Sequence, residues 1–380
     1  MNRAQQELMQ NATVLTRAGR LQDATIALQR ALGSAAFELP GFVAPAAPRF
    51  TAPRAEAGVA VRGVDAWRVL DGLVTDVKAK GKVNLADADR HAAADAFTTR
   101  TFSHGGRSIT YKLFVPGGLG QVLRPLIVML HGCTQNPDDF AAGTGMNALA
   151  VEHGFRVLYP AQAQDINPQR CWTWFKHNHQ QRGRGEPALL AALTQSVMSE
   201  GAVDQDRVFI AGLSAGGAMA TIVAQAYPDI FSAVGVHSGL ARGTAKDAMA
   251  AMMAMKSGTG PAAAAVQADS IGVPTIVFHG DADTTVHPDH GGHVLAASFA
   301  AATVRRLSVQ QGASAQGQRY TQEVYADVGG AVVAEYWQLH NAGHAWSGGS
   351  RHGSYTDPRG PEASREMLRF FMAHGRPHKN

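Results

Sequence analysis

Short apolar runs alternate with helical segments over most of the chain, from about residue 102 onward. Runs such as Leu126-Ile127-Val128-Met129-Leu130 are apolar throughout, which is typical of strands buried on both faces of a parallel sheet. The alternation of such strands with helices predicts an α/β fold, a mostly parallel sheet flanked by helices. The predicted strands are Ile109–Val115, Leu126–Leu130, Arg156–Tyr159, Val208–Ala211, Ala233–Val236, Thr275–Phe278 and Ala334–Leu339.

The N-terminal part of the chain follows a different pattern. Residues 1–36 predict a small helical segment, because apolar side chains recur there at roughly helical spacing, at Leu8, Leu15, Leu21, Ala24, Leu28 and Leu32. Residues 37–97 predict a linker with one short helix near Trp67–Val77, since the stretch holds Pro40, Pro45, Pro48 and Pro53. Residues 98–376 form the predicted α/β domain. The helical segment could pack on that domain, or it could serve self-association or attachment to an apolar surface.

The strongest chemical signal is Gly212-Leu213-Ser214-Ala215-Gly216, which matches the G-x-S-x-G pattern. It follows the predicted strand Val208–Ala211 directly, and residues 215–227 behind it predict a helix that ends before Pro228. Small flanking residues let the backbones of strand and helix approach at the sharp turn on which such a serine sits. We therefore predict that Ser214 is a catalytic nucleophile.

A serine nucleophile needs a base that accepts its proton and an acid that fixes the tautomer of the base. The loop after Thr275–Phe278 begins His279-Gly280-Asp281-Ala282-Asp283 and resembles the H-G-x-x-D-x-x-V pattern of α/β-hydrolases. On this pattern Asp283 is the predicted acid, and Asp281 is the alternative. His344 lies just after the last predicted strand and is the predicted base, because the order Ser, Asp, His is the one that the α/β-hydrolase fold uses.

Two backbone N–H groups are expected to stabilise the oxyanion that forms during acyl transfer. One is the amide of Ala215, directly after the nucleophile. The other should lie in the loop after Leu126–Leu130, where His131-Gly132-Cys133-Thr134-Gln135 stands, and Cys133 is the candidate. We expect His131 to order this loop and not to act as a second base.

Several motifs together resemble the poly(3-hydroxybutyrate) depolymerase family of esterases, over about residues 98–376. They are Leu130-His131-Gly132-Cys133-Thr134-Gln135, Cys171-Trp172-Thr173-Trp174-Phe175, Gly212-Leu213-Ser214-Ala215-Gly216-Gly217-Ala218-Met219, Val236-His237-Ser238-Gly239 and Gly343-His344-Ala345-Trp346. The resemblance implies an α/β-hydrolase fold and a serine esterase, and it also includes feruloyl and acetyl-xylan esterases. The candidates for substrate contact in these motifs are Trp172, Trp174, His237 and Trp346, whose indoles could form an exposed apolar shelf or could simply pack the loops.

Three weaker features leave alternatives open. Cys133 and Cys171 are the only cysteines; both stand in motif loops, where they could form a disulfide in an oxidising compartment or stay thiols in the cytosol. His287, His290 and His293 recur every third residue, but the proposed chemistry requires no metal, and we expect neither a metal nor a cofactor. The Met-rich stretch Asp247–Ala265 could be a covering helix or a mobile lid.

Charge and hydropathy exclude some partners. The 34 basic residues are scattered among 30 acidic ones for a formal charge of +4, so no stripe suited to nucleic acid is expected. No stretch approaches the length of about 18 apolar residues that a membrane span needs. The first twenty residues lack an apolar leader-like run, which favours the cytoplasm, with secretion as the alternative because many members of the family are secreted.

These observations predict a serine esterase that hydrolyses esters of hydroxyacids, oligomeric or polymeric, through an acyl-enzyme. The alternatives are a feruloyl or acetyl-xylan type esterase, and an acyltransferase that uses the same triad with an alcohol in place of water. A non-catalytic binding protein on the same scaffold is the least favoured, because the sequence retains all three triad residues. Attachment to polymer granules through residues 1–36 is a further expectation.

Overall fold

The computed structural model describes residues 94–120, 122–260, 272–299 and 303–376. They all belong to the larger of two compact units of the chain, residues 65–380. The predicted helical segment 1–36 and the predicted linker up to residue 93 lie outside the described residues. Among the helices that the structure describes, none has both the length and the apolar composition to cross a membrane.

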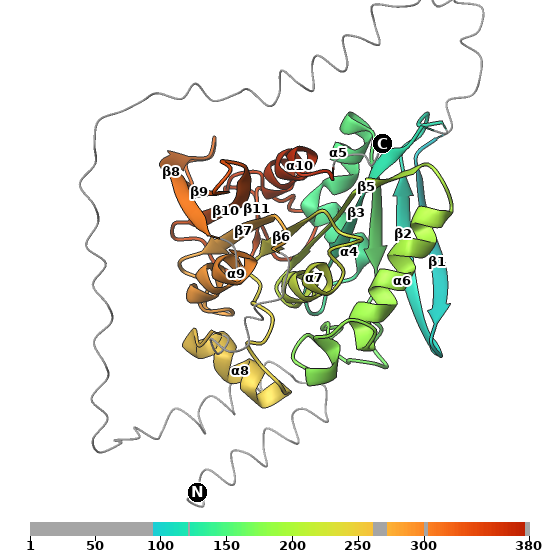
Figure 1. Cartoon of the computed structure of the whole chain (residues 1–380), viewed down its shortest axis with the longest axis horizontal. Helices are drawn as coiled ribbons and strands as arrows, with labels where there is room; N and C mark the ends of the chain where they lie inside the picture. The colour runs from blue at the N-terminus through green and yellow to red at the C-terminus, as the bar shows by residue number, and fades with distance from the viewer. Residues whose placement is uncertain (1–93, 121, 261–271, 300–302, 377–380) are drawn as a thin grey trace, which may run out of the picture. The chain divides into compact units, whose positions relative to one another are not determined.

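The described part of the chain is built on one large twisted sheet of ten strands in the order β1-β2-β4-β3-β5-β6-β7-β10-β9-β8 (Figure 1). The six central strands, β4 to β10 in this order, run parallel, and the strands at both edges pair antiparallel. The strands are β1 (Ala96–His104), β2 (Arg107–Val115), β3 (Arg124–Leu130), β4 (Arg156–Pro160), β5 (Val203–Leu213), β6 (Ala233–His237), β7 (Thr275–Gly280), β8 (Val304–Ala313), β9 (Arg319–Asp327) and β10 (Val332–Leu339). A small second sheet pairs β11 (Trp346–Ser347) with β12 (Thr356–Asp357).

Helices cover both faces of the large sheet (Figure 1). In β3 the side chains of Leu126 and Val128 join the core on one face, and those of Ile127 and Met129 join the core on the other, as the two-residue period of a strand requires. The first face carries α6 (Gly185–Ser199), α7 (Ala215–Ala226), α8 (Ala248–Ser257) and α9 (Asp289–Phe299). The second face carries α4 (Pro137–Thr144), α5 (Met146–His153) and α10 (Ala363–Ala373).

Each predicted strand lies within a strand of the structure, and the predicted α/β class is confirmed. The edge strands β1, β8 and β9 are additional. Most residues of β1 and β8 are exposed, so these strands carry no apolar run from which the sequence could reveal them. The sheet begins at Ala96, two residues before the predicted start of the domain at 98.

Candidate active site

Ser214 occupies the sharp turn between β5 and α7. Its backbone has φ 57° and ψ −120°, a conformation that residues other than glycine rarely adopt and that costs on the order of 1–3 kcal/mol. The turn is tight because glycine stands on either side: a Cβ at Gly216 would clash with the carbonyl oxygen of Leu130, and one at Gly212 with the backbone of Gly216. Strand register and glycine spacing thus present the Ser214 side chain at the carboxyl edge of the sheet.

The neighbouring parallel strands end at the same edge. Leu213 of β5 pairs with His237 of β6, His237 pairs with Phe278 of β7, and Phe278 pairs with Trp337 of β10. The loops that follow β7 and β10 carry the predicted acid and base. The α/β architecture therefore brings Ser214, Asp283 and His344 to one edge, although 130 positions separate the first from the last.

Asp283 and His344 form a direct pair. Asp283 Oδ2 lies 2.7 Å from His344 Nδ1, and the carboxylate is fully buried. Its other oxygen accepts hydrogen bonds from the amides of Thr285 and Val286 at 2.8 and 2.9 Å. Burial acts to raise the pKa of Asp283, but the hydrogen bond and charge of His344, together with the Val286 amide, hold this pKa below its usual value. The carboxylate is thus ionised near neutral pH and fixes the His344 ring with Nε2 free for the nucleophile.

Asp281 has a different partner. Its Oδ2 lies 2.9 Å from His340 Nδ1, and its Oδ1 accepts the amide of Asn341 at 2.6 Å. The His340 ring is further held by Thr321 Oγ1 at 2.8 Å. Asp281 therefore fixes the turn after β10 through His340 and Asn341.

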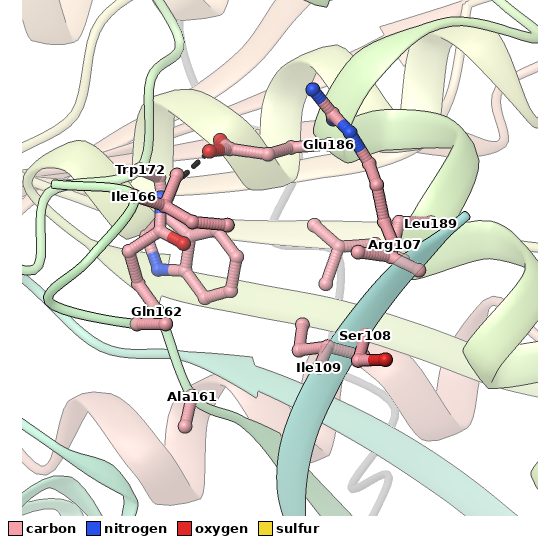
Figure 2. Close-up of a pocket in the computed structure, with 11 residues that line it drawn as sticks. Arg107, Ser108, Ile109, Ala161, Gln162, Ile166, Trp172, Glu186 and Leu189 are labelled. Carbon is pink, nitrogen blue, oxygen red and sulfur yellow. Dashed lines mark hydrogen bonds between the residues drawn. The ribbon is translucent and has the colours of Figure 1, made fainter. Parts of the chain in front are cut away.

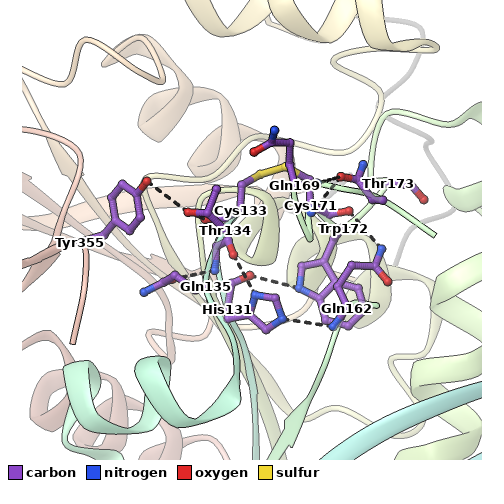
Figure 3. Close-up of a disulfide and its surroundings, with 12 residues drawn as sticks. His131, Cys133, Thr134, Gln135, Gln162, Gln169, Cys171, Trp172, Thr173 and Tyr355 are labelled. Carbon is purple, nitrogen blue, oxygen red and sulfur yellow. Dashed lines mark hydrogen bonds between the residues drawn. A yellow bond between two sulfur atoms is a disulfide. The ribbon is translucent and has the colours of Figure 1, made fainter. Parts of the chain in front are cut away.

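The loop that holds the predicted oxyanion amide is densely bonded (Figure 3). The amides on both sides of Cys133 have acceptors: Gly132 N donates to Gln135 Oε1 at 2.9 Å, and Thr134 N donates to Gln169 O at 2.6 Å. Within the described residues the Cys133 amide itself has no acceptor. Ala215 is the first residue of α7, a position whose N–H has no partner inside the helix. Both candidate amides are therefore available to a ligand oxygen.

His131 orders this loop through both ring nitrogens. Gln162 N donates to His131 Nε2 at 3.1 Å, so the proton sits on Nδ1, which lies 2.8 Å from Gly132 O. Burial lowers the pKa of His131 to about 4, and the ring is neutral near pH 7. With both nitrogens occupied, His131 is not placed to serve as a base.

A disulfide joins Cys133 to Cys171 and ties the same loop to residues 171–175, the Trp-rich loop (Figure 3). The indole of Trp172 adds a second link, since its Nε1 donates to His131 O at 3.1 Å. The predicted alternative of two free thiols does not hold in this structure.

Of the two alternatives for the tryptophans, the structure supports packing of the loops and contradicts an exposed shelf that contacts substrate. Trp172, Trp174 and Trp346 are 0%, 4% and 1% exposed, and all three lie in the core clusters beneath the site. Trp346 donates from Nε1 to Ser364 Oγ at 3.0 Å and packs edge-on against Phe140. The buried indoles fill the space between motif loops and sheet, and those of Trp172 and Trp346 have a hydrogen-bond acceptor for their N–H, so they support the site and do not offer a surface to substrate.

His237 is also a buried support and not a substrate contact. Its ring stacks between Phe278 and Trp346, and its Nε2 accepts the amide of Ser347 at 3.0 Å. Burial lowers the pKa of His237 to about 3, so the ring is neutral near pH 7. It connects the end of β6 to the segment after His344.

The structure adds residues that the sequence did not single out. Tyr355 is 47% exposed, lies 3.2 Å from Thr134 Oγ1 through its hydroxyl, and accepts the amide of Trp346 through its carbonyl. It connects the oxyanion loop to the segment after His344. Glu186 is buried beneath the Trp-rich loop. Neither residue stands in a recognisable motif; only their contacts reveal them.

The Met-rich stretch is in contact with the segment that carries the three spaced histidines. Helix α8 buries Ala251 and Ala254 and exposes the methionines at 249, 252 and 253. His290 Nε2 lies 2.8 Å from Ala254 O, so this histidine fastens α8 to α9. In the part of the chain that the structure describes, no group of three or more His, Cys, Asp or Glu side chains is arranged to hold a metal ion.

Comparison with known proteins places this geometry in a family. The family model described as esterase PHB depolymerase matches residues 109–329, which is more than half of the chain. The chain belongs to this family. The family resemblance predicted from the motifs is confirmed; the matched range holds Ser214 and Asp283, and His344 lies beyond its end.

Individual relatives cover less of the chain. A poly(3-hydroxyalkanoate) depolymerase C of Paucimonas lemoignei is 33% identical over 183 residues, 46% of this chain and 44% of that protein. A feruloyl esterase B of Thermothelomyces thermophilus is 31% identical over 160 residues, 42% of this chain and 54% of that protein. The chain thus spans about half the length of the curated relatives it matches.

A solved acetyl xylan esterase from Aspergillus awamori confirms the fold. It superposes with a TM-score of 0.55 over 73% of this chain and 99% of its own, at 17% sequence identity. At this identity the likeness concerns the fold alone, and it bears out the predicted α/β-hydrolase fold.

Proposed function

We propose that the protein is a serine carboxylic-ester hydrolase with Ser214 as nucleophile, His344 as base and Asp283 as the acid that orients the base. The observation that carries this proposal is the buried pair of Asp283 and His344, 2.7 Å apart, at the sheet edge where Ser214 occupies a strained, glycine-flanked turn. Membership of an esterase family supports the same chemistry.

The first half-reaction forms an acyl-enzyme. Ser214 Oγ attacks the ester carbonyl carbon while its proton moves to His344 Nε2, which Asp283 leaves free by holding Nδ1. The oxyanion of the tetrahedral intermediate accepts hydrogen bonds from the amides of Cys133 and Ala215. When the carbon–oxygen bond to the alcohol breaks, the leaving oxygen takes the proton from His344.

The second half-reaction releases the acid. Water attacks the acyl carbon and passes a proton to His344, the same two amides stabilise the new oxyanion, and the bond to Ser214 Oγ breaks. The serine oxygen regains its proton from His344, and the site returns to its starting state. Every proton in this cycle is carried by one imidazole.

We propose esters of 3-hydroxyalkanoic acids, as oligomers or polymer, as the leading substrates. The family description and the depolymerase from Paucimonas lemoignei support this class. Feruloyl esters are the second candidate, because a feruloyl esterase is nearly as similar in sequence. With the tryptophans buried, Tyr355 is the exposed aromatic side chain bonded to the oxyanion loop and is proposed to contact substrate.

The deciding experiment compares the wild type with Ser214→Ala on p-nitrophenyl esters of rising chain length, methyl ferulate and amorphous polyhydroxybutyrate. Because the triad acts as a unit, Ser214→Ala should lose activity by about 10⁴-fold or more with the circular dichroism spectrum unchanged. The highest kcat/KM on hydroxybutyrate oligomers supports the depolymerase assignment, and the highest kcat/KM on methyl ferulate supports the feruloyl alternative. A Ser214→Ala variant with more than about a tenth of the wild-type rate would refute the nucleophile.

Product analysis separates hydrolysis from acyl transfer. In the presence of a primary alcohol, a hydrolase releases mainly free acid, whereas an acyltransferase forms mainly the new ester. We propose hydrolysis as the dominant route.

The compartment and the role of residues 1–36 are also proposals. The disulfide between Cys133 and Cys171 is typical of an oxidising compartment and favours the secreted alternative over the cytoplasm. Granule attachment or self-association through residues 1–36 is tested by comparing the full chain with a variant that lacks them, in granule sedimentation and in light scattering. If the two proteins sediment equally with granules and form particles with the same number of chains, both roles are excluded.

A further inference from the structure

Glu186 is a buried carboxyl group that the proposed mechanism does not use. It lies in the first turn of α6, and its side chain is 5% exposed. In Figure 2 its side chain extends toward Trp172 and Gln162, and all three residues line one pocket. A buried carboxyl group requires hydrogen-bond donors, and its partners show what it holds in place.

Both carboxyl oxygens accept hydrogen bonds from N–H donors. Oε1 accepts the side-chain amide of Gln162 at 2.6 Å, and Oε2 accepts the backbone amide of Thr173 at 2.7 Å. The Gln162 amide also donates to Cys171 O at 3.0 Å. Glu186 therefore anchors the short segment Cys171–Thr173 at both of its ends.

That segment in turn holds the oxyanion loop. Cys171 is bonded to Cys133 through the disulfide, and the Trp172 indole donates to His131 O. Gln162 adds a third link, because its backbone amide donates to His131 Nε2. Three connections thus run from Gln162 and the Cys171–Thr173 segment to His131 and Cys133.

We propose that Glu186 is a positioning residue for the oxyanion hole, acting through Gln162 and the Cys171–Thr173 segment on the Cys133 amide. The inference rests on the proposed function, since it takes the Cys133 amide as an oxyanion donor. Loss of such a donor lowers kcat by about 10²–10³-fold, and a displacement of about 1 Å can have an effect of similar size. A carboxyl group suits this place because the two groups hydrogen-bonded to it, the Gln162 side chain and the Thr173 amide, are both donors.

The test is Glu186→Gln, which keeps the shape of the side chain but replaces one carboxyl oxygen with an NH₂ group. This group cannot accept a hydrogen bond, so one of the two donors, Gln162 or Thr173, loses its partner. We expect kcat on p-nitrophenyl butyrate to fall by about 10-fold or more with KM changed less than about 2-fold. Affinity for a trifluoromethyl ketone, which forms a tetrahedral oxyanion adduct with Ser214, should fall in parallel with kcat. Hydrogen exchange of residues 131–135 should become faster.

Glu335→Gln is the matched control. Glu335 is equally buried, in β10, and accepts hydrogen bonds from Gln322 of β9, Trp337 of β10 and Arg369 of α10. This variant should lose thermal stability and leave kcat, inhibitor affinity and exchange at 131–135 within about 2-fold of the wild type. If Glu186→Gln matches the control in all three measurements, Glu186 is merely structural and the proposal is wrong.

Two further arms keep the result decisive. Should Glu186→Gln fail to fold, Gln162→Asn withdraws the side-chain amide from Glu186 and Cys171 while retaining the backbone bond to His131, and it should show the same split between kcat and KM. Should the wild type hydrolyse no ester, the proposed function fails, yet hydrogen exchange still decides the inference: unchanged exchange at 131–135 in Glu186→Gln overturns it.

Discussion

At the scale of single residues, the site depends on two neighbouring carboxylates that the fold assigns to different histidines. Asp283 is fully buried and bonded to His344 and two backbone amides, whereas Asp281 is partly exposed and bonded to His340 and Asn341. The carboxylate that is proposed to orient the base and the carboxylate that fixes a turn are therefore only two positions apart in one loop.

Asp283→Asn and Asp281→Asn test this division. In Asp283→Asn an amide NH₂ replaces one acceptor, so the His344 tautomer is no longer held, and kcat should fall by about 10³–10⁴-fold. In Asp281→Asn the triad keeps its bonds, and kcat should stay within about 10-fold of the wild type, with some loss of thermal stability. Steady-state kinetics on one p-nitrophenyl ester measures both. A larger loss of kcat in the Asp281 variant would mean that Asp281, and not Asp283, is the catalytic acid.

At the scale of elements, the aromatic residues join the loops to the sheet. The ring of Trp346 lies between Phe140 of α4 and His237 of β6, and its N–H is satisfied by Ser364 of α10. Elements from both the sheet and its covering layer thus meet at one indole, which sits two residues beyond His344.

Trp346→Ala should therefore act through stability. Removing a buried indole lowers the free energy of unfolding by about 3–5 kcal/mol. Because the whole site loosens, kcat/KM should fall by the same factor on p-nitrophenyl acetate and on hydroxybutyrate oligomers. Chemical denaturation and the ratio of the two kcat/KM values are the measurements. A loss confined to the oligomers would restore a role for this tryptophan in contacting substrate.

The disulfide is the second link between elements. It fastens the loop after β3 to the segment before α6 at the residue whose amide is proposed to stabilise the oxyanion. Reduction leaves the other bonds of the loop, so the fold should persist while the amide loses its fixed position.

Cys171→Ser, or the wild type in dithiothreitol, should show a kcat lowered by roughly 10-fold with KM little changed. Circular dichroism should remain that of the native fold. Dithiothreitol should have no effect on Cys171→Ser, which serves as the control for unrelated effects of the reductant. Full activity of the reduced wild type would mean that the hydrogen bonds alone fix the loop.

At the scale of the whole molecule, three buried neutral histidines make the fold sensitive to acid. Burial lowers the pKa of His131 to about 4, of His237 to about 3 and of His279 to about 4, from an ordinary value of 6.5. Between pH 6.5 and about 4 the unfolded chain binds a proton at each of these imidazoles and the folded protein does not. Their contribution to stability is therefore complete above pH 6.5 and is lost as the pH falls toward their folded pKa values.

Unfolding in urea at pH 7.5, 6.0 and 5.0 measures this contribution. Each histidine should lower the free energy of unfolding by up to about 1.4 kcal/mol per pH unit below 6.5. A His237→Gln variant should be less stable at pH 7.5 but show a shallower dependence on pH. Constant stability from pH 7.5 to 5.0 would mean that these rings bind protons equally in the folded and the unfolded protein.

The sequence by itself determined the features that local pattern encodes. Continuous apolar runs alternating with helical segments predicted the central strands, the glycines around Ser214 predicted the turn, and the chain order of Ser214, Asp283 and His344 predicted the triad. Strand period and turn chemistry depend on residues a few positions apart, so they can be read along the chain. The exposed edge strands β1 and β8 carry no such apolar run and were missed.

Only the tertiary structure decided which groups meet. Asp281 pairs with His340, 59 positions away, and Glu186 bonds to Gln162 and Thr173. Trp346 and His237 are buried by segments that lie far from them in the sequence. The type of a residue does not reveal whether its side chain turns to solvent or to the core, because that depends on which loops pack over the sheet. A tryptophan beside a catalytic histidine has the same local pattern in either case, and here the packing places it inside.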